Sequence, residues 1–177
     1  MPLGILSGAL IARLLGAPVG RWFHVTALPL LFVLAGGKLV GVLGATGQGA
    51  ASDLLWATSY AGPGPWGSLA AELPAHPSQL YEAAAIAVVI GVLYALTRNA
   101  RLARRNGAVL FLALGLWAIA RVVVGFTWRD DAAIGPLGME QALAIVVLAI
   151  AGLGLVERLR AGGATNARRL DPEARSA

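Results

Sequence analysis

A short run of polar residues opens one of the apolar segments of this chain. Residues 76–82 read HPSQLYE, and His76, Gln79 and Glu82 follow one another at intervals of three. On a helix this spacing places the three side chains on one face. An imidazole exchanges protons near neutral pH, and Gln79 and Tyr81 add neutral hydrogen-bonding groups. The run therefore predicts proton-transfer chemistry at a helix entrance, with a simple helix-capping role for the histidine as the alternative.

Charged residues also lie inside the apolar segments. Lys38, Glu82 and Arg121 are internal, and Glu140 stands beside Gln141 near the start of another segment. Charges in membrane spans are energetically expensive and mark functional sites. Counted along helices, all four lie roughly 5–12 Å below the same outer surface. We expect one polar pocket opening to the outer leaflet; the alternative is a structural pairing of Glu82 with Lys38 or Arg121.

The composition is that of an integral membrane protein. Of the 177 residues, 58% are hydrophobic and 13% charged, whereas a soluble domain has roughly 25% charged residues. This excludes a soluble enzyme, a secreted disulfide scaffold and a disordered binder. The chain has no cysteine and two histidines, of which only His76 lies in the polar run; that one histidine with scattered carboxylates makes no recognisable ligand set. We therefore expect no metal and no organic cofactor.

Five apolar segments must position these side chains. Three have the length of about 20 residues that a membrane span needs, a fourth contains Lys38, and the first is short and contains Arg13. We predict an all-α polytopic transmembrane helix bundle of about five spans. The expected spans are Pro2 to about Gly16, Thr26–Ala45, Pro77–Thr97, Gly107–Phe126 and Leu137–Val156.

The remaining segments are predicted to lie outside the bilayer. Residues 47–75 are rich in Gly and Pro and contain aromatic residues that favour the membrane interface. We expect them to form an outer loop with a short helix near residues 53–56. Residues 1–156 then form the transmembrane domain, and residues 157–177 form a polar, Arg-rich cytoplasmic tail that ends in disorder.

The arginine distribution predicts the orientation. With five spans, 11 of the 14 basic residues fall on one side, which the positive-inside rule places in the cytoplasm. The N-terminus is then outside and the C-terminus cytoplasmic. The same placement accounts for the net charge of +5 without a nucleic-acid partner. These residues are Arg13, Arg21, Arg98, Arg101, Arg104, Arg105, Arg158, Arg160, Arg168, Arg169 and Arg175.

The sequence HPSQLYE resembles the signature of the prolipoprotein diacylglyceryl transferases. Further stretches between about residues 3 and 156 resemble motifs of this family in the same order. GGKL at 36–39 is similar to its Gly-Gly-Arg motif, and SDLLWA at 52–57 to its Thr-Asp-Leu-Pro-Trp-Ala loop. Residues 121–131 are similar to its Arg-Phe-x-x-Glu-Phe-Phe-Arg motif, and residues 137–141 to its Met-x-Gln helix start.

The resemblance implies an activity and a location. Family members move a diacylglyceryl group from phosphatidylglycerol to the lipobox cysteine of a prolipoprotein, forming a thioether and releasing glycerol phosphate. The chain would be a multi-pass protein of the bacterial cytoplasmic (inner) membrane, working at the outer leaflet. Its partners would be phosphatidylglycerol, the prolipoprotein signal peptide and the membrane lipid bilayer.

The resemblance also implies roles for the polar residues. A base must generate the thiolate nucleophile, and cations must hold the phosphate leaving group. His76 is the candidate base, with Glu82 or Gln79 orienting its ring, and Arg121 and Lys38 are the candidate clamp. The expected catalytic residues are His76, Arg121 and Glu82. The expected substrate-binding residues are Lys38, Gln79, Tyr81, Arg129, Glu140 and Gln141.

Several departures keep alternatives open. Lys38 and Gly125 stand where the family has Arg and Glu, and Arg129 comes one residue later than in the motif. Family members also have two further spans at the amino-terminal end, so this is a divergent, N-terminally short member or a chain whose start was set too far downstream. A catalytically degraded relative that binds anionic phospholipid or assists a membrane partner is the main alternative. A small transporter is disfavoured, because the sequence shows no pairwise repeat.

Overall fold

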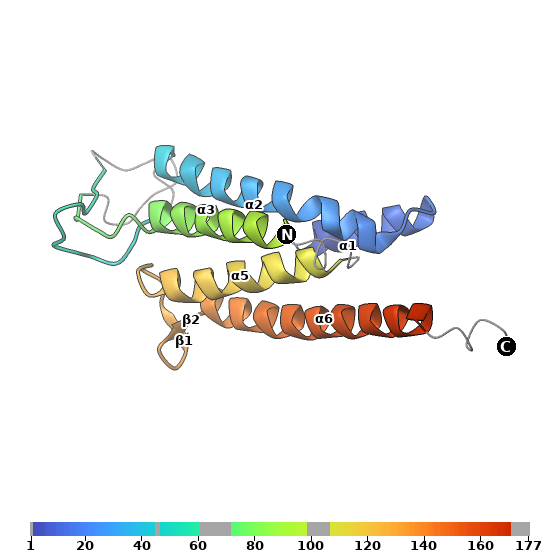
Figure 1. Ribbon diagram of the computed structural model, residues 1–177. Helices are drawn as coiled ribbons and strands as arrows, with labels where there is room; N and C mark the ends of the chain where they lie inside the picture. Colours follow the sequence, from blue (N-terminus) through green and yellow to red (C-terminus); the bar gives the residue numbers. More distant parts are fainter. Residues whose placement is uncertain (1, 45–46, 61–71, 99–106, 171–177) are drawn as a thin grey trace.

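The computed structural model of the chain is a bundle of long helices running side by side (Figure 1). It describes residues 2–44, 47–60, 72–98 and 107–170. Two short strands, β1 (Ala132–Ile134) and β2 (Leu137–Gly138), pair antiparallel just before the last helix. The helices are α1 (Pro2–Leu14), α2 (Val19–Leu43), α3 (Ser78–Thr97), α5 (Ala108–Gly125) and α6 (Met139–Leu170).

Within the described residues, four helices are long and apolar enough to cross a membrane: α2, α3, α5 and the Met139–Arg160 part of α6. The predicted all-α polytopic bundle is therefore confirmed. The first apolar segment does form a helix, α1, but its 13 residues extend only about 20 Å, less than the hydrocarbon thickness of about 30 Å. Helix α2 begins at Val19, seven residues before the predicted Thr26.

Three helices enclose the apolar core and the fourth packs beside them. Helices α2, α3 and α5 contact one another, and α6 lies along α5. The two helices approach closely: a Cβ on Gly154 of α6 would lie 2.4 Å from the ring of Phe111 on α5, so a side chain there would force the ring to move. The core cluster comprises Ala27, Leu31, Ile86, Val89, Leu93, Val109, Leu110 and Ala113.

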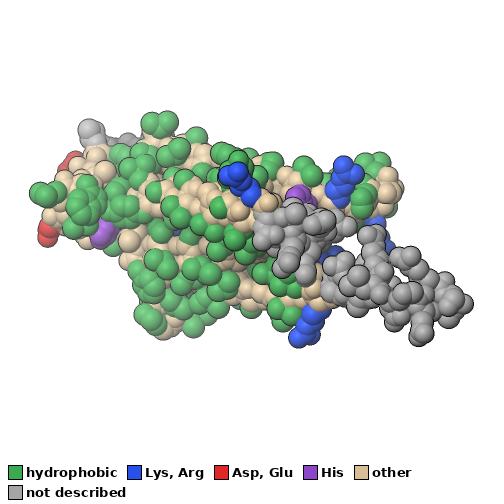
Figure 2. Space-filling view, viewed as in Figure 1, with side chains coloured by type: hydrophobic (Ala, Val, Ile, Leu, Met, Phe, Trp, Pro, Cys, Tyr) green, Lys and Arg blue, Asp and Glu red, His purple; other side chains and the backbone are tan. Residues whose placement is uncertain are grey.

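The outer surface of the bundle is apolar (Figure 2). Large hydrophobic side chains such as Phe32, Val88 and Leu153 are exposed on α2, α3 and α6, as expected for helices whose outer faces meet lipid. Most of the visible Lys and Arg side chains lie in the half of the molecule that carries the carboxyl-terminal end of α6, and visible acidic side chains lie at the opposite end. The membrane orientation itself stays a prediction.

The outer-loop residues fold against the helix ends instead of forming a helix of their own. Backbone bridges join Gly49 to Trp128, and join both Ala51 and Thr58 to Ala75. The predicted short helix near residues 53–56 is wrong: the chain makes a tight turn there, in which the amide of Ala57 donates to the carbonyl of Leu54 over 2.9 Å. Because both flanks pair with Ala75, the intervening residues must reverse direction. Residues 61–71 of the predicted loop lie outside the described residues.

Helix α6 continues beyond the predicted end of the last span. It runs through Val156 to Leu170, so the start of the predicted tail is helical, and residues 171–177 lie outside the described part of the chain. The division at 156 into a membrane domain and a cytoplasmic tail stays a prediction.

Candidate functional site

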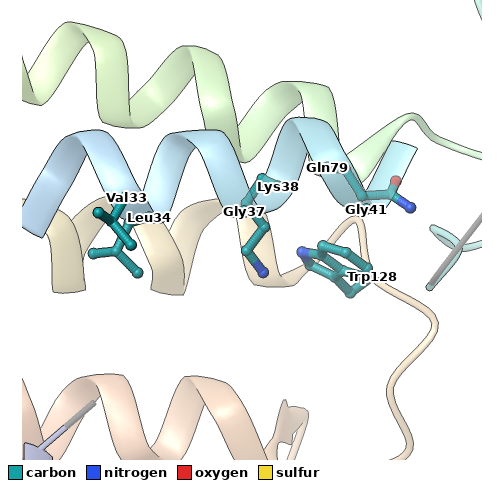
Figure 3. Close-up of a pocket in the computed structure, with 7 residues that line it drawn as sticks. All are labelled: Val33, Leu34, Gly37, Lys38, Gly41, Gln79 and Trp128. Carbon is teal, nitrogen blue, oxygen red and sulfur yellow. The ribbon is translucent and has the colours of Figure 1, made fainter. Parts of the chain in front are cut away.

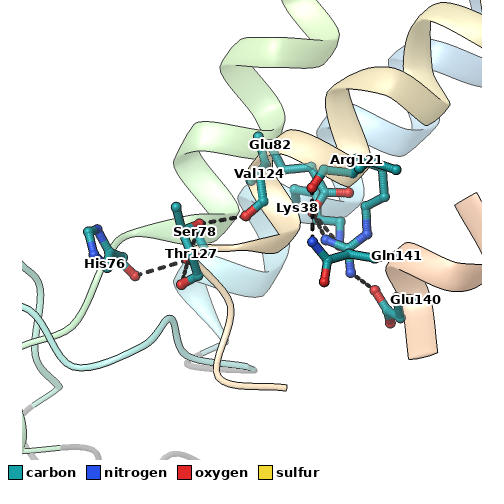
Figure 4. Close-up of polar contacts among 10 residues, drawn as sticks. Lys38, His76, Ser78, Glu82, Arg121, Val124, Thr127, Glu140 and Gln141 are labelled. Atoms are coloured by element: carbon teal, nitrogen blue, oxygen red, sulfur yellow. Dashed lines mark hydrogen bonds and ion pairs between the residues drawn. The ribbon is translucent and has the colours of Figure 1, made fainter. Parts of the chain in front are cut away.

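Four charged side chains, one from each long helix, meet near the end of the bundle where α3 begins (Figure 4). The carboxylate of Glu82 on α3 is the centre. Its Oε2 lies 3.0 Å from Nζ of Lys38 on α2 and 2.6 Å from Nη1 of Arg121 on α5. The other guanidinium nitrogen of Arg121, Nη2, pairs with Glu140 on α6. We call these four residues the charged quartet.

Burial divides the quartet into an inner pair and an outer pair. The side chains of Glu82 and Arg121 are 3% and 5% exposed, whereas those of Lys38 and Glu140 are 27% and 60% exposed. An uncompensated buried charge would be strongly unfavourable, so Glu82 and Arg121 stabilise each other. The structural pairing considered from the sequence is therefore present. Lys38 and Glu140 are the members that a ligand can reach directly.

A pocket opens beside Lys38 (Figure 3). It has a volume of about 280 Å³, and one face of α2 forms its apolar wall. A Cβ on Gly37 would meet nothing within 4 Å, which agrees with open space above that glycine. One end of the pocket is polar and the rest is apolar. The lining residues are Val33, Leu34, Gly37, Lys38, Gly41, Gln79 and Trp128.

Trp128 connects the pocket with the quartet. Its ring centroid lies 4.9 Å from Nζ of Lys38 and 5.3 Å from Cζ of Arg121, within the range of cation–π attraction. Sequence reasoning missed this residue, because a tryptophan at a span end is accounted for by the membrane interface alone. The available signal was its place in the motif. Trp128 stands where the family motif has its second arginine, and Arg129 follows directly after it.

The HPSQLYE run is divided by the start of α3. The helix begins at Ser78 and Pro77 is its N-cap residue, with ψ 62°. His76 therefore precedes the helix and does not share a helical face with Gln79 and Glu82, contrary to the spacing argument. Ser78 is fully buried and donates to the carbonyl of Thr127 over 2.7 Å, which ties the helix start to the end of α5.

His76 lies on the other side of Ser78 and Thr127 from the charged quartet (Figure 4). Its Nδ1 is buried and has no hydrogen-bond partner among the described residues. Its ring meets that of Tyr81 edge-on at 6.1 Å, and the Tyr81 hydroxyl accepts a hydrogen bond from Trp56 over 2.5 Å. Glu82 binds the two cations, so it does not orient this imidazole in the described arrangement.

The remaining predicted site residues, Gln79, Arg129 and Gln141, lie outside the quartet. Gln79 and Gln141 form hydrogen bonds to backbone groups. Gln79 donates to the carbonyl of Gly47 over 2.6 Å and also lines the pocket. The exposed Arg129 reaches Oε1 of Gln48 at 3.4 Å. Gln141 is 4% exposed; it donates to the carbonyl of Val122 over 3.0 Å and accepts from the amide of Gly138 over 2.9 Å.

Gly125 makes the buried position of Gln141 possible. A Cβ on Gly125 would lie 2.4 Å from Cγ of Gln141, so the residue that departs from the family motif leaves the space that Gln141 occupies. Within the described ranges, no group of three or more His, Cys, Asp or Glu side chains has an arrangement that could hold a metal ion.

Sequence comparisons identify the family to which the chain is similar. The sequence model of the family described as "Prolipoprotein diacylglyceryl transferase" matches residues 2–157. Similar curated proteins are named phosphatidylglycerol–prolipoprotein diacylglyceryl transferase. The protein of Allorhizobium ampelinum is 30% identical over 171 residues, covering 90% of this chain and 57% of the relative. That of Brucella ovis is 31% identical over 170 residues, covering 92% and 57%.

A third relative, from Nitrobacter winogradskyi, carries the same name and is 32% identical over 111 residues, covering 59% of this chain and 36% of the relative. The chain thus spans little more than half the length of the first of these curated relatives. No solved structure matches it. Since the family match covers α2, α3, α5 and the first part of α6 and includes every member of the charged quartet, this chain belongs to the prolipoprotein diacylglyceryl transferase family.

Proposed function

We propose that this chain transfers a diacylglyceryl group from phosphatidylglycerol to the cysteine thiol of a prolipoprotein signal peptide. The observation that carries the proposal is the accessible ammonium of Lys38, which lies at the polar end of an apolar-walled pocket and is backed by the buried Glu82–Arg121 pair. An anionic headgroup with attached acyl chains has the charge and the apolar length that such a pocket accommodates.

The reaction needs charge stabilisation at the leaving group. The cysteine thiolate attacks the carbon of the diacylglyceryl unit that carries the phosphate ester. A C–S bond forms at this carbon, and its C–O bond to the phosphate breaks. Its electron pair leaves with glycerol phosphate. Lys38 is placed to stabilise the charge that develops on this oxygen. Arg121 can add a second contact once Glu140 moves aside, which its 60% exposed side chain permits.

A base must accept the thiol proton. We assign this role to His76, because its Nδ1 has no partner among the described residues and an imidazole accepts a proton near neutral pH. Its position across Ser78 and Thr127 from the quartet supports an approach of the peptide and the lipid from different sides. Tyr81 and Arg129 are assigned to substrate binding on the loop side, and Gln79 to binding in the pocket that it lines with Lys38.

We also propose where the reaction takes place. The quartet end of the bundle faces the outer leaflet of the cytoplasmic membrane, and the carboxyl-terminal end of α6 faces the cytoplasm. The gathering of Lys and Arg in the opposite half of the molecule supports this orientation under the positive-inside rule.

A degraded, lipid-binding relative is the second candidate. It is favoured by the pairing of Arg121 with carboxylates on both sides and by Gly125, which provides no carboxylate where the family motif has one. Such a protein would bind anionic phospholipid in the same pocket or assist a membrane partner, and would transfer nothing.

A mass-spectrometric transfer assay separates the two candidates. The purified chain is incubated with phosphatidylglycerol and a synthetic lipobox peptide, and His76→Ala serves as the control. A gain of one diacylglyceryl unit on the peptide, absent in the control, is the expected result. An unchanged peptide mass while lipid remains bound would contradict the transferase and identify the lipid-binding relative.

A further inference from the structure

Trp128 carries a polar group that no described residue satisfies. Its indole Nε1 is buried and has no hydrogen-bond partner in the described part of the chain. The residue lines the pocket beside Lys38, and the indole nitrogen lies on the edge of the ring that faces the Lys38 amine (Figure 3). A buried N–H without an acceptor is unfavourable and calls for an explanation.

No described neighbour accepts a hydrogen bond from this N–H. The indole N–H, the ammonium of Lys38 and the guanidinium of Arg121 are all donors and accept no hydrogen bond. The two cations lie against the ring of Trp128, and both bind Glu82 through the same oxygen, Oε2. Two cations and one buried N–H thus converge at the polar end of the pocket, an arrangement that favours an acceptor with negative charge.

We propose that the indole N–H of Trp128 donates a hydrogen bond to a phosphodiester oxygen of an anionic lipid bound in this pocket. The apolar wall of Val33 and Leu34 below the polar end favours a lipid over a free phosphate, because a soluble anion would leave that wall unfilled. The inference rests on the proposed function, since its ligand is the proposed diacylglyceryl donor. Trp128 thus becomes a substrate-positioning residue for this chain.

The chain offers a matched control for the experiment. Trp117 on α5 also has a buried Nε1 with no partner among the described residues, but its side chain packs against the apolar core cluster and does not line the pocket. Trp128→Phe and Trp117→Phe both remove one buried N–H and keep an aromatic ring. Trp128→benzothienylalanine replaces only the N–H by sulfur and preserves the ring size, so it separates the hydrogen bond from packing.

The measurement is equilibrium binding of short-chain phosphatidylglycerol to the purified full chain in neutral detergent, with phosphatidylcholine as the zwitterionic comparison. We expect both Trp128 variants to weaken phosphatidylglycerol binding about tenfold, the effect of one hydrogen bond to a charged acceptor. Trp117→Phe should bind as the wild type does. Unchanged binding by both Trp128 variants would overturn the proposal, and so would an equal loss in Trp117→Phe.

Binding of glycerol phosphate is measured as well, to distinguish a lipid headgroup from a free phosphate as the ligand. If the Trp128 variants weaken glycerol phosphate binding but leave phosphatidylglycerol binding unchanged, the ligand is the free anion and the lipid assignment is wrong. The transfer assay is run on the same preparations. Wild-type chain that transfers nothing while its phosphatidylglycerol binding depends on Trp128 would reject the proposed transferase and retain the role of Trp128.

Discussion

Arg121 of α5 donates to Oε2 of Glu82 on α3 over 2.6 Å, and both side chains are almost fully buried. This contact joins two of the three helices that enclose the core. Lys38 adds a third helix to the same carboxylate oxygen. The charge of Glu82 therefore holds α2, α3 and α5 together at the end of the bundle where the pocket opens.

Removing this carboxylate is expected to destabilise the protein. Glu82→Gln leaves the buried Arg121 without its inner partner, which costs about 3 kcal/mol for a buried pair that loses one member. The measurement is the free energy of unfolding of the detergent-solubilised chain. Glu140→Gln is the matched control, because its 60% exposed side chain makes a pair worth about 1 kcal/mol or less. Equal losses in the two variants would show that burial does not decide the strength of these pairs.

Glu140 is expected to compete with the lipid phosphate for Arg121. Glu140→Gln removes the negative charge on the outer side of the guanidinium, so phosphatidylglycerol should bind several-fold more tightly at low ionic strength, and the gain should shrink as salt is added. Glu157→Gln, an exposed carboxylate farther along α6, should have no effect. Weaker binding by Glu140→Gln would mean that this carboxylate supports the ligand.

Lys38 can be probed chemically, because it is the only lysine in the sequence. Its side chain is 27% exposed at the pocket, so an amine-reactive reagent should label it slowly in neutral lipid. Phosphatidylglycerol should lower the labelling rate further, since a bound phosphate covers the ammonium. Peptide mapping by mass spectrometry separates Lys38 from the terminal amine, which serves as the internal control. Equal protection of both amines would contradict binding at the pocket.

The phosphate clamp predicts unequal effects of two arginines. Arg121→Ala should reduce diacylglyceryl transfer by at least a hundredfold, in the range found when a transition-state donor is removed. Arg160→Ala, at an exposed position near the other end of the bundle, should transfer as the wild type does. The initial rate is measured with the lipobox peptide, and the fraction of folded protein is measured in parallel. Equal rates in the two variants would contradict the clamp.

Gly125 is expected to tolerate no side chain. Gly125→Ala places a Cβ 2.4 Å from Cγ of Gln141, which would disturb the hydrogen bonds of Gln141 to Val122 and Gly138 and destabilise the chain by about 1–3 kcal/mol. In Gly91→Ala the new Cβ meets nothing within 4 Å, so this control should be neutral or stabilising. Thermal unfolding in detergent compares them, and an unaffected Gly125→Ala would show that Gln141 has room to move.

The sequence by itself determined the class of the protein and the elements that build it. Hydropathy is a local property, so runs such as 77–97 and 107–126 predicted α3 and α5 to within a residue or two. Depth along a helix is also local, because each residue adds a fixed rise. For this reason the sequence could place Lys38, Glu82, Arg121 and Glu140 at a common level before any contact was known.

Only the tertiary structure decided how those residues combine. Which helices are neighbours, and how each is rotated, depends on packing between segments far apart in the sequence, such as Gly154 against Phe111. That packing makes Glu82 the shared partner of two cations, places Trp128 against both of them and leaves His76 across Ser78 and Thr127. Periodicity placed His76 on one face with Glu82, but α3 begins only at Ser78, whose hydroxyl donates to the carbonyl of Thr127, 49 residues later.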